Sequence, residues 1–148
     1  MKLIIDGADG AGKSTLAKML GEKLNLDVVH MRGKDSMRFP FLYHTLDKLD
    51  VIWDRHFLSE RIYSEFYDLP YRITKGQEKV LHQKCKDNDV KIIICNPVKH
   101  NVTDDEDEDI VERHDEIVKA YEELIEEYDL ISVDPFTMSL DEIIDLIS

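Results

Sequence analysis

The chain has 148 residues, 43% of them hydrophobic and 34% charged, which suits one domain with a hydrophobic core and leaves no room for a second. Its formal charge is −13, but the acid is local: residues 1–103 hold 17 Lys or Arg against 14 Asp or Glu, and residues 104–148 hold two against 18. This distribution argues against a general nucleic-acid-binding surface and leaves room for a positive phosphate site in the first part of the chain.

Neither a membrane span nor a disulfide is expected from this sequence. No apolar run approaches the roughly 20 residues that a membrane-spanning helix needs, and the first residues do not have the shape of a signal peptide. We therefore expect a cytoplasmic protein without a membrane or nucleic-acid partner, and we leave open whether it forms a homodimer. Cys85 and Cys95 lack metal-ligand spacing and are expected to be reduced, partly buried thiols.

The first pattern along the chain is a phosphate-binding loop. Residues 7–14 (GADGAGKS) fit G-x-x-x-x-G-K-[S/T] without a mismatch, after an apolar run at residues 2–5 and before helical spacing at residues 14–24. A strand, a glycine turn and a helix therefore stand in the required order, which favours a phosphate site over a glycine-rich turn that merely begins a helix. In such a loop, backbone N–H groups and the positive end of the helix dipole face the bound phosphate.

We expect this loop to bind the phosphates of ATP. Lys13 would reach the β and γ phosphates, and the Ser14 hydroxyl would ligate a Mg²⁺ ion. The predicted ATP-binding residues are those of the loop and the residue that follows it: Gly7, Ala8, Asp9, Gly10, Ala11, Gly12, Lys13, Ser14 and Thr15.

The rest of the chain alternates between predicted strands and helices. Strands are expected at residues 27–31, 51–53, 91–95 and 130–133, and helices at residues 40–49, 58–67, 74–88, 106–128 and from 139 onward. Two helices begin with predicted capping boxes, Thr74 with Gln77 and Ser139 with Glu142. The alternation predicts an α/β protein with the P-loop NTPase fold: a doubly wound parallel sheet of about five strands with helices on both faces, in one domain over residues 1–148.

Six successive acidic residues, 104–109, form the one low-complexity stretch. Negative charge at this position would repel the γ phosphate of ATP if it faced the nucleotide. We expect instead that these residues cap the N-terminus of the helix at 106–128, where negative charge is favourable, and point to solvent.

Four segments resemble the thymidylate kinase and deoxynucleoside kinase group of P-loop kinases. Residues 5–15 (IDGADGAGKST) are similar to the thymidylate kinase phosphate loop, including its Asp. Residues 54–67 (DRHFLSERIYSEFY) resemble both the D-R-[Y/H] stretch of thymidylate kinases and the E-R-S-x-x-S-D-R stretch of deoxynucleoside kinases. Residues 113–124 and 128–135 are similar to a helix of thymidylate kinases and to the strand after it, which ends in Asp. This chain is shorter than typical members.

The resemblance implies a kinase that transfers a phosphoryl group from ATP, with Mg²⁺, to a small-molecule nucleotide. It implies that Asp9 binds the sugar 3′-hydroxyl of the acceptor, that Asp54 organises Mg²⁺ through water, and that Arg55 holds the acceptor's phosphate. Ser59 and Arg61 would line the same pocket. A Lys, a metal and Arg side chains at strand ends also fit the chemistry, because phosphoryl transfer depends mainly on neutralising charge. The predicted catalytic residues are Lys13, Asp54 and Arg55.

Other readings of the residues behind these site predictions are open. Asp54 and Arg55 could also form an ordinary ion pair at the end of a strand. Arg61 could be a solvated residue on the surface of a helix. Phe41 would stack on an acceptor base or pack in the core. Arg32 and Arg38 are candidate phosphate ligands on a loop that would otherwise carry ordinary surface charge.

Two further expectations concern the other cations. Lys99 and Arg113 are the candidates for a rudimentary lid that contacts the transferring phosphate. Of the six histidines, His56 is the one expected near the site, because it follows Arg55.

The acceptor is expected to be a nucleoside monophosphate. Its phosphate oxygen is already ionised, whereas a nucleoside hydroxyl needs a general base. Deoxynucleoside kinases place a Glu for this task just after the second strand, where this chain has the cations Arg32 and Lys34, with Asp35 the acid close by. A deoxynucleoside kinase is the alternative, and a degenerate P-loop protein that binds nucleotide without turnover is the third reading.

Overall fold

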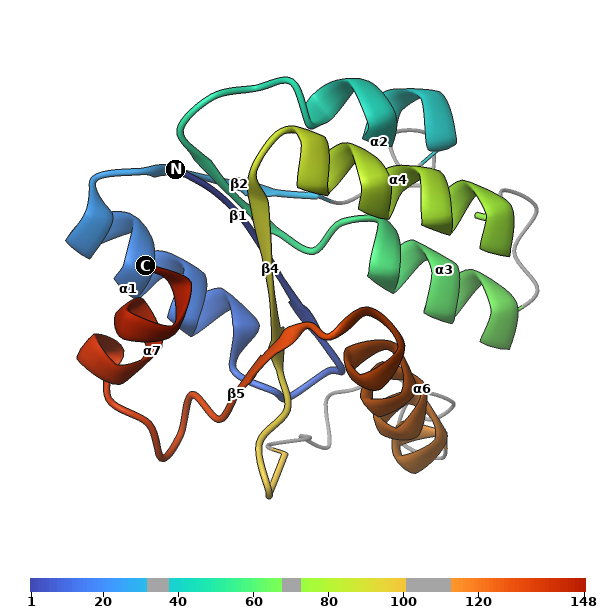
Figure 1. Cartoon of the computed structure of the whole chain (residues 1–148). Helices are drawn as coiled ribbons and strands as arrows, with labels where there is room; N and C mark the ends of the chain where they lie inside the picture. Colours follow the sequence, from blue (N-terminus) through green and yellow to red (C-terminus); the bar gives the residue numbers. More distant parts are fainter. Residues whose placement is uncertain (32–37, 68–72, 101–112) are drawn as a thin grey trace.

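The structure is a computed structural model of the chain, and it describes residues 1–31, 38–67, 73–100 and 113–148. Five parallel strands form one sheet in the order β2-β3-β1-β4-β5 (Figure 1). The strands are β1 (Lys2–Gly7), β2 (Asp27–His30), β3 (Val51–Asp54), β4 (Val90–Cys95) and β5 (Ile131–Val133). The predicted parallel α/β sheet of about five strands is therefore confirmed.

Helices cover both faces of the sheet, as predicted. They are α1 (Lys13–Leu24), α2 (Phe39–Thr45), α3 (Phe57–Phe66), α4 (Lys75–Asp87), α6 (His114–Tyr128) and α7 (Leu140–Ile147). In Figure 1, α1 and α7 lie on one face, and α2, α3, α4 and α6 lie on the other. Each face has its own hydrophobic core, because successive residues of a strand point to opposite sides.

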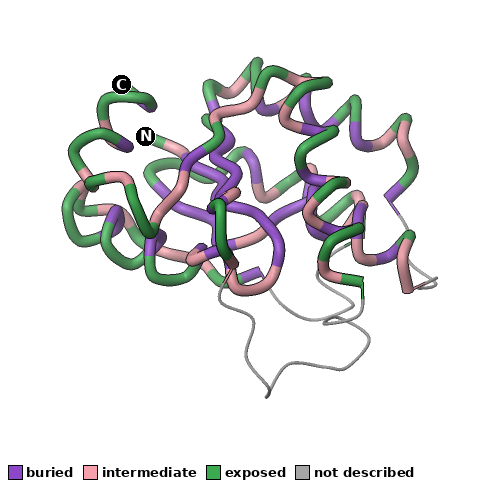
Figure 2. The backbone as a smooth tube through the Cα atoms, turned by 90° about the horizontal axis from the view of Figure 1, so that it is seen from below, coloured by how far each residue is buried: buried purple, intermediate pink, exposed green. Residues whose placement is uncertain are grey.

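The central strand, β1, has a sequence that is one apolar run because the strand is buried on both faces of the sheet. Leu3 and Ile5 of β1 belong to the core under α1 and α7, whereas Ile4 belongs to the core under the other helices. A strand that is buried on both faces has no polar side to show. Figure 2 shows that buried residues gather in the middle of the molecule, whereas exposed residues lie mostly around it. The edge strand β2 has no fully buried residue.

The helix boundaries agree with the predicted caps. Thr74 and Gln77 form a capping box at the start of α4, and Ser139 and Glu142 form another at the start of α7. The predicted helix at 40–49 ends earlier, at Thr45, whose hydroxyl donates to the Leu42 carbonyl 2.7 Å away. Such a side-chain bond competes with the helical backbone bonds.

Part of the predicted helix at 106–128 lies outside the described residues. The described helix, α6, begins at His114. The acidic run 104–109 also lies outside the described residues, so its predicted capping role stays a prediction.

Both cysteines are free and buried, as expected. Burial raises the pKa of the Cys85 thiol and that of the Cys95 thiol to about 12. Within the described residues, the helices are too short or too polar to cross a membrane.

Candidate functional site

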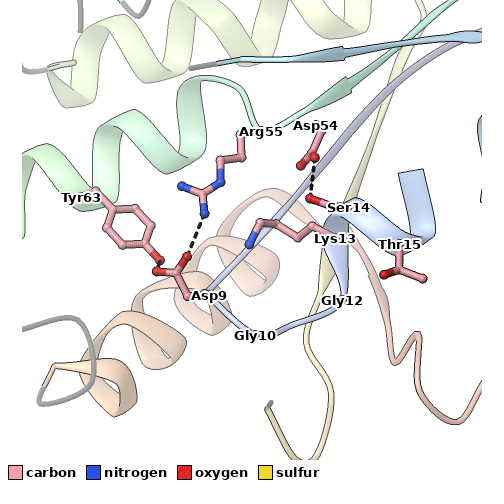
Figure 3. Close-up of a pocket in the computed structure, with 9 residues that line it drawn as sticks. All are labelled: Asp9, Gly10, Gly12, Lys13, Ser14, Thr15, Asp54, Arg55 and Tyr63. Atoms are coloured by element: carbon pink, nitrogen blue, oxygen red, sulfur yellow. Dashed lines mark hydrogen bonds and ion pairs between the residues drawn. The ribbon is translucent and has the colours of Figure 1, made fainter. Parts of the chain in front are cut away.

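A cavity of about 670 Å³ opens at the carboxyl ends of β1 and β3 (Figure 3). This is the edge at which open parallel sheets bind ligands. The lining residues come from the phosphate loop, the start of α1, the end of β3 and α3: Asp9, Gly10, Gly12, Lys13, Ser14, Thr15, Asp54, Arg55 and Tyr63. Most of the loop that the sequence predicts to bind ATP therefore faces one cavity.

The glycines of the loop hold backbone shapes and contacts that a side chain would disturb. Gly7 has φ +146°, and a Cβ there would lie 2.5 Å from the Cys95 carbonyl oxygen. Gly12, with φ +87°, precedes the first residue of α1. A Cβ at Gly12 would lie 3.2 Å from a ring carbon of Phe136, an exposed aromatic after β5 that the sequence analysis did not single out. The loop thus fits closely against both its neighbours.

Lys13 is buried at the floor of the cavity. Its ammonium donates a hydrogen bond to the Ala8 carbonyl oxygen at 2.9 Å, so it folds back over the loop. Burial, together with the nearby Arg55 guanidinium, lowers the pKa of Lys13. This cation therefore stands at the place where the loop would receive phosphate oxygens.

The predicted metal-binding pair is assembled across two elements. The Ser14 hydroxyl donates to Oδ2 of Asp54 at 2.8 Å, and Asp54 is 3% exposed. The parallel register places Asp54 beside Ile5, two residues before the loop begins. A hydroxyl and a carboxylate at this separation are oxygen ligands of the kind that Mg²⁺ prefers, so the residues present fit the ion.

A histidine does adjoin this pair, but it is His30 and not His56. The His30 Nδ1 atom lies 2.7 Å from Oδ2 of Asp54, because His30 ends β2 in register with Asp54 on β3. The expectation for His56 is wrong. Its ring is fully buried, with Nε2 2.8 Å from the Thr45 hydroxyl, and burial lowers its pKa to about 3.

Asp9, Arg55 and Tyr63 form a second cluster in the cavity. A guanidinium N–H of Arg55 donates to Asp9 at 2.8 Å, and the Tyr63 hydroxyl donates to the other Asp9 oxygen at 3.0 Å. The guanidinium also lies 5.8 Å from the centre of the Tyr63 ring. Burial disfavours the charged guanidinium, but Asp6 and Asp9 outweigh it and raise the pKa of Arg55. Arg55 is therefore a permanent cation, and Tyr63 is a lining residue that the sequence analysis missed.

Two predicted pocket residues of α3 lie elsewhere. Ser59 is buried beneath the cavity, where its backbone N–H donates to Asp6 at 3.1 Å, and it is outside the described lining. Arg61 pairs with Glu65 and lies 3.8 Å from Glu78, beside a separate cavity between α3, α4 and α6. The structure does not bring either residue into the cavity of the phosphate loop.

The remaining predicted residues are also apart from the cavity or are not described. Phe41 is exposed on α2, and Arg38 is the residue before that helix. Lys99 borders another cavity, of about 520 Å³, between the loop after β4 and α6. Arg113 donates to the Phe66 carbonyl at the end of α3. Arg32, together with Lys34 and Asp35, lies outside the described residues. The predictions for these residues stay predictions.

Comparisons with known proteins rest on structure alone. No protein-family model and no curated protein matches the sequence. The chain is similar in structure to the YorR protein of Bacillus subtilis, solved in complex with phosphorylated GDP, with a TM-score of 0.71 and 22% identity over 99% of this chain and 93% of that one. The chain has the fold of P-loop NTPases.

A second similar protein is the deoxyadenosine kinase of M. mycoides. Its complex with dATP matches with a TM-score of 0.55 and 19% identity, over 99% of this chain and 97% of that one. Its complex with the products dCMP and a flexible dCDP matches with a TM-score of 0.54 and 19% identity, over 99% and 96%. At these identities the likeness establishes the fold.

Proposed function

We propose that the chain is a P-loop kinase that transfers the γ-phosphoryl group of ATP to a nucleoside monophosphate in a Mg²⁺-dependent reaction. One observation carries the proposal: a single cavity joins the buried ammonium of Lys13, the Ser14–Asp54 pair and the guanidinium of Arg55. Phosphoryl transfer needs these parts, because its catalysis consists mainly of positioning and of stabilising negative charge.

The chain's own residues divide the work as follows. The backbone N–H groups of the loop and the Lys13 ammonium would bind the β and γ phosphates. To do so, the ammonium would give up its hydrogen bond to the Ala8 carbonyl oxygen and bind phosphate oxygens instead. Ser14 and Asp54 would hold Mg²⁺, which when bound neutralises charge on the transferring group. Arg55 offers a planar fork that can grip an acceptor phosphate through two hydrogen bonds.

The charges around the cavity favour an acceptor that is already ionised. Of the described residues that line it, two are carboxylates, and both have partners: Asp9 accepts from Arg55 and Tyr63, and Asp54 accepts from Ser14. Neither stands ready to take a proton from a sugar hydroxyl. An anionic phosphate, by contrast, would find a permanent cation in Arg55.

The likeness to a deoxyadenosine kinase supports the second candidate, a nucleoside kinase. In that reaction the acceptor is the 5′-hydroxyl of a deoxynucleoside, and a general base is needed. Asp35 is the predicted base, and it lies outside the described residues.

The test is formation of ADP from Mg-ATP with a panel of deoxynucleosides and their monophosphates. Lys13→Ala serves as the blank. Lys23→Ala, the removal of an exposed lysine from the last turn of the same helix, is the matched control and should keep full activity. Turnover confined to monophosphates would support the proposal and identify the base.

Other outcomes would redirect the assignment. Turnover with nucleosides alone, abolished in Asp35→Ala, would make the chain a nucleoside kinase. ATP binding without any acceptor-dependent turnover would refute both kinases and indicate a degenerate P-loop protein. ADP formation that does not depend on an acceptor would indicate a hydrolase.

A further inference from the structure

Asp6 is a fully buried carboxylate directly before the phosphate loop, and the mechanism above does not use it. Its Oδ1 atom accepts hydrogen bonds from the Gly7 N–H at 2.8 Å, the Tyr121 hydroxyl at 2.9 Å and the Ser59 hydroxyl. Its Oδ2 atom accepts from the N–H groups of His56 at 3.2 Å and Ser59 at 3.1 Å. Five donors therefore satisfy the two oxygens of this buried carboxyl group.

These donors come from three separate parts of the fold. Gly7 begins the phosphate loop, His56 and Ser59 stand at the N-terminal end of α3, and Tyr121 lies in the middle of α6. His56 precedes the first residue of α3 and makes no side-chain capping bond. Asp6 therefore supplies the cap of α3 from another strand, and negative charge is favourable at that helix end.

Two neighbouring groups of β1, the Ile5 carbonyl and the Asp6 carboxylate, fix the backbone at Arg55 and at the residue after it. Arg55 has φ +72°, a conformation that costs free energy for a residue with a side chain. Its own N–H donates to the Ile5 carbonyl at 2.8 Å, and the next N–H, of His56, donates to Asp6. Both anchors lie at the end of β1. The charge of Asp6 also favours the cationic form of Arg55.

We propose that Asp6 is a positioning residue that holds Arg55 and α3 in place against the phosphate loop, with Tyr121 of α6 holding Asp6 in turn. The inference deepens the proposed function and rests on it for its kinetic test. Asp6 does not face the cavity, so it acts through Arg55 and not on the substrate. Weakening its hydrogen bonds should therefore affect the use of the acceptor more than the binding of ATP.

Two tyrosines of α6 provide a matched pair of variants. Tyr121 donates to Asp6, and Tyr128 donates to a second buried carboxylate, Glu78, at 2.6 Å. Glu78 belongs to the separate cluster between α3, α4 and α6 and is remote from the phosphate loop. Tyr121→Phe and Tyr128→Phe each remove one hydroxyl donor from one buried acid, so both should lower the midpoint of thermal unfolding.

Only Tyr121→Phe should change the kinetics of the acceptor. We expect kcat/KM for the acceptor to fall about 10- to 100-fold, as small displacements of positioning groups do, while KM for ATP changes less than about threefold. Tyr128→Phe should keep both parameters within about twofold of the wild type. Equal kinetic effects of the two variants, or unchanged acceptor kinetics in Tyr121→Phe, would overturn the proposal.

A second readout does not depend on the enzyme being a kinase. The NMR signal of the Arg55 Nε–H group reports the position and hydrogen bonding of the guanidinium. It should shift in Tyr121→Phe and stay in place in Tyr128→Phe. If the Arg55 signal did not move in Tyr121→Phe, the positioning role would be refuted even if the wild type were an active kinase. If the wild type had no kinase activity but the signal moved in Tyr121→Phe, only the proposed function would be refuted.

Discussion

His82 on α4 should make the protein sensitive to mild acid. Its side chain is 5% exposed, with the imidazole stacked on Tyr128 at a centroid distance of 3.6 Å and edge-on to Phe57 at 5.0 Å. Its Nε2 atom is buried without a hydrogen-bond partner among the described residues. Burial lowers the pKa of His82 to about 4 from an ordinary value of 6.5. The folded protein therefore keeps this ring neutral where the unfolded chain would protonate it.

The sign and size of the effect follow from that difference in pKa. Between pH 6.5 and about 4 the unfolded state holds one more proton on His82 than the folded state does. The free energy of unfolding therefore falls as the pH falls, by about 1.4 kcal/mol per pH unit. From pH 7.5 to pH 4.5, His82 alone should cost about 2 to 3 kcal/mol.

Urea unfolding at several pH values would measure this loss. Trp53 is the single tryptophan and is 1% exposed, so its fluorescence reports the core. The variant His82→Phe keeps an aromatic ring and removes the titrating group. Subtracting the free energy of unfolding of the wild type from that of the variant at each pH cancels the contributions of the other titrating groups. This difference should shift in favour of the variant by about 2 to 3 kcal/mol between pH 7.5 and pH 4.5. A difference that stays constant with pH would refute the reasoning.

Four further predictions concern other residues. Burial raises the pKa of Glu60 to about 7, so stability should fall as the pH rises from 4.5 through 7, and Glu60→Gln should flatten this part of the unfolding profile. Gly7→Ala should lower the free energy of unfolding by about 1 to 3 kcal/mol in thermal unfolding and abolish turnover, because the new Cβ would clash with the Cys95 carbonyl. Unchanged stability would show that the loop can shift to accommodate the Cβ. The Phe136 ring lies against Gly12 of the loop that is predicted to bind ATP, so Phe136→Ala should raise KM for ATP. Phe41→Ala should raise KM for the acceptor. If initial rates showed that Phe136→Ala raises KM for the acceptor and Phe41→Ala raises KM for ATP, the two assignments would be exchanged.

Local patterns in the sequence were sufficient to predict the phosphate loop, the strands and the two capping boxes. Each depends on residues within a few positions of one another. Ser59 and Arg61 show where such reasoning fails, because residues two apart on a helix face different directions. Ser59 turns toward Asp6, and Arg61 turns toward Glu78. Tyr63, which faces the cavity, lies one turn after Ser59 and could have been considered on that spacing.

The contact between His30 and Asp54 could not be predicted in this way. It depends on the order of the strands, which places β2 beside β3 in a register that aligns the two residues. Alternation of strands and helices indicates a parallel sheet but does not by itself fix that order. His56 seemed the better candidate because it is adjacent to Arg55 in the sequence, yet the turn into α3 carries its ring into the core.

The central place of β1 bears on how the protein forms during synthesis. β1 (Lys2–Gly7) leaves the ribosome before its two partners, β3 and β4, which end at residues 54 and 95. The Cys95 carbonyl that packs against Gly7 is the last part of this frame to be made. A nascent chain therefore cannot complete the surroundings of the phosphate loop until residue 95 has emerged, and domains usually fold as units during translation. Ribosome-bound chains of increasing length should thus bind no ligand at this site until β4 is free of the exit tunnel.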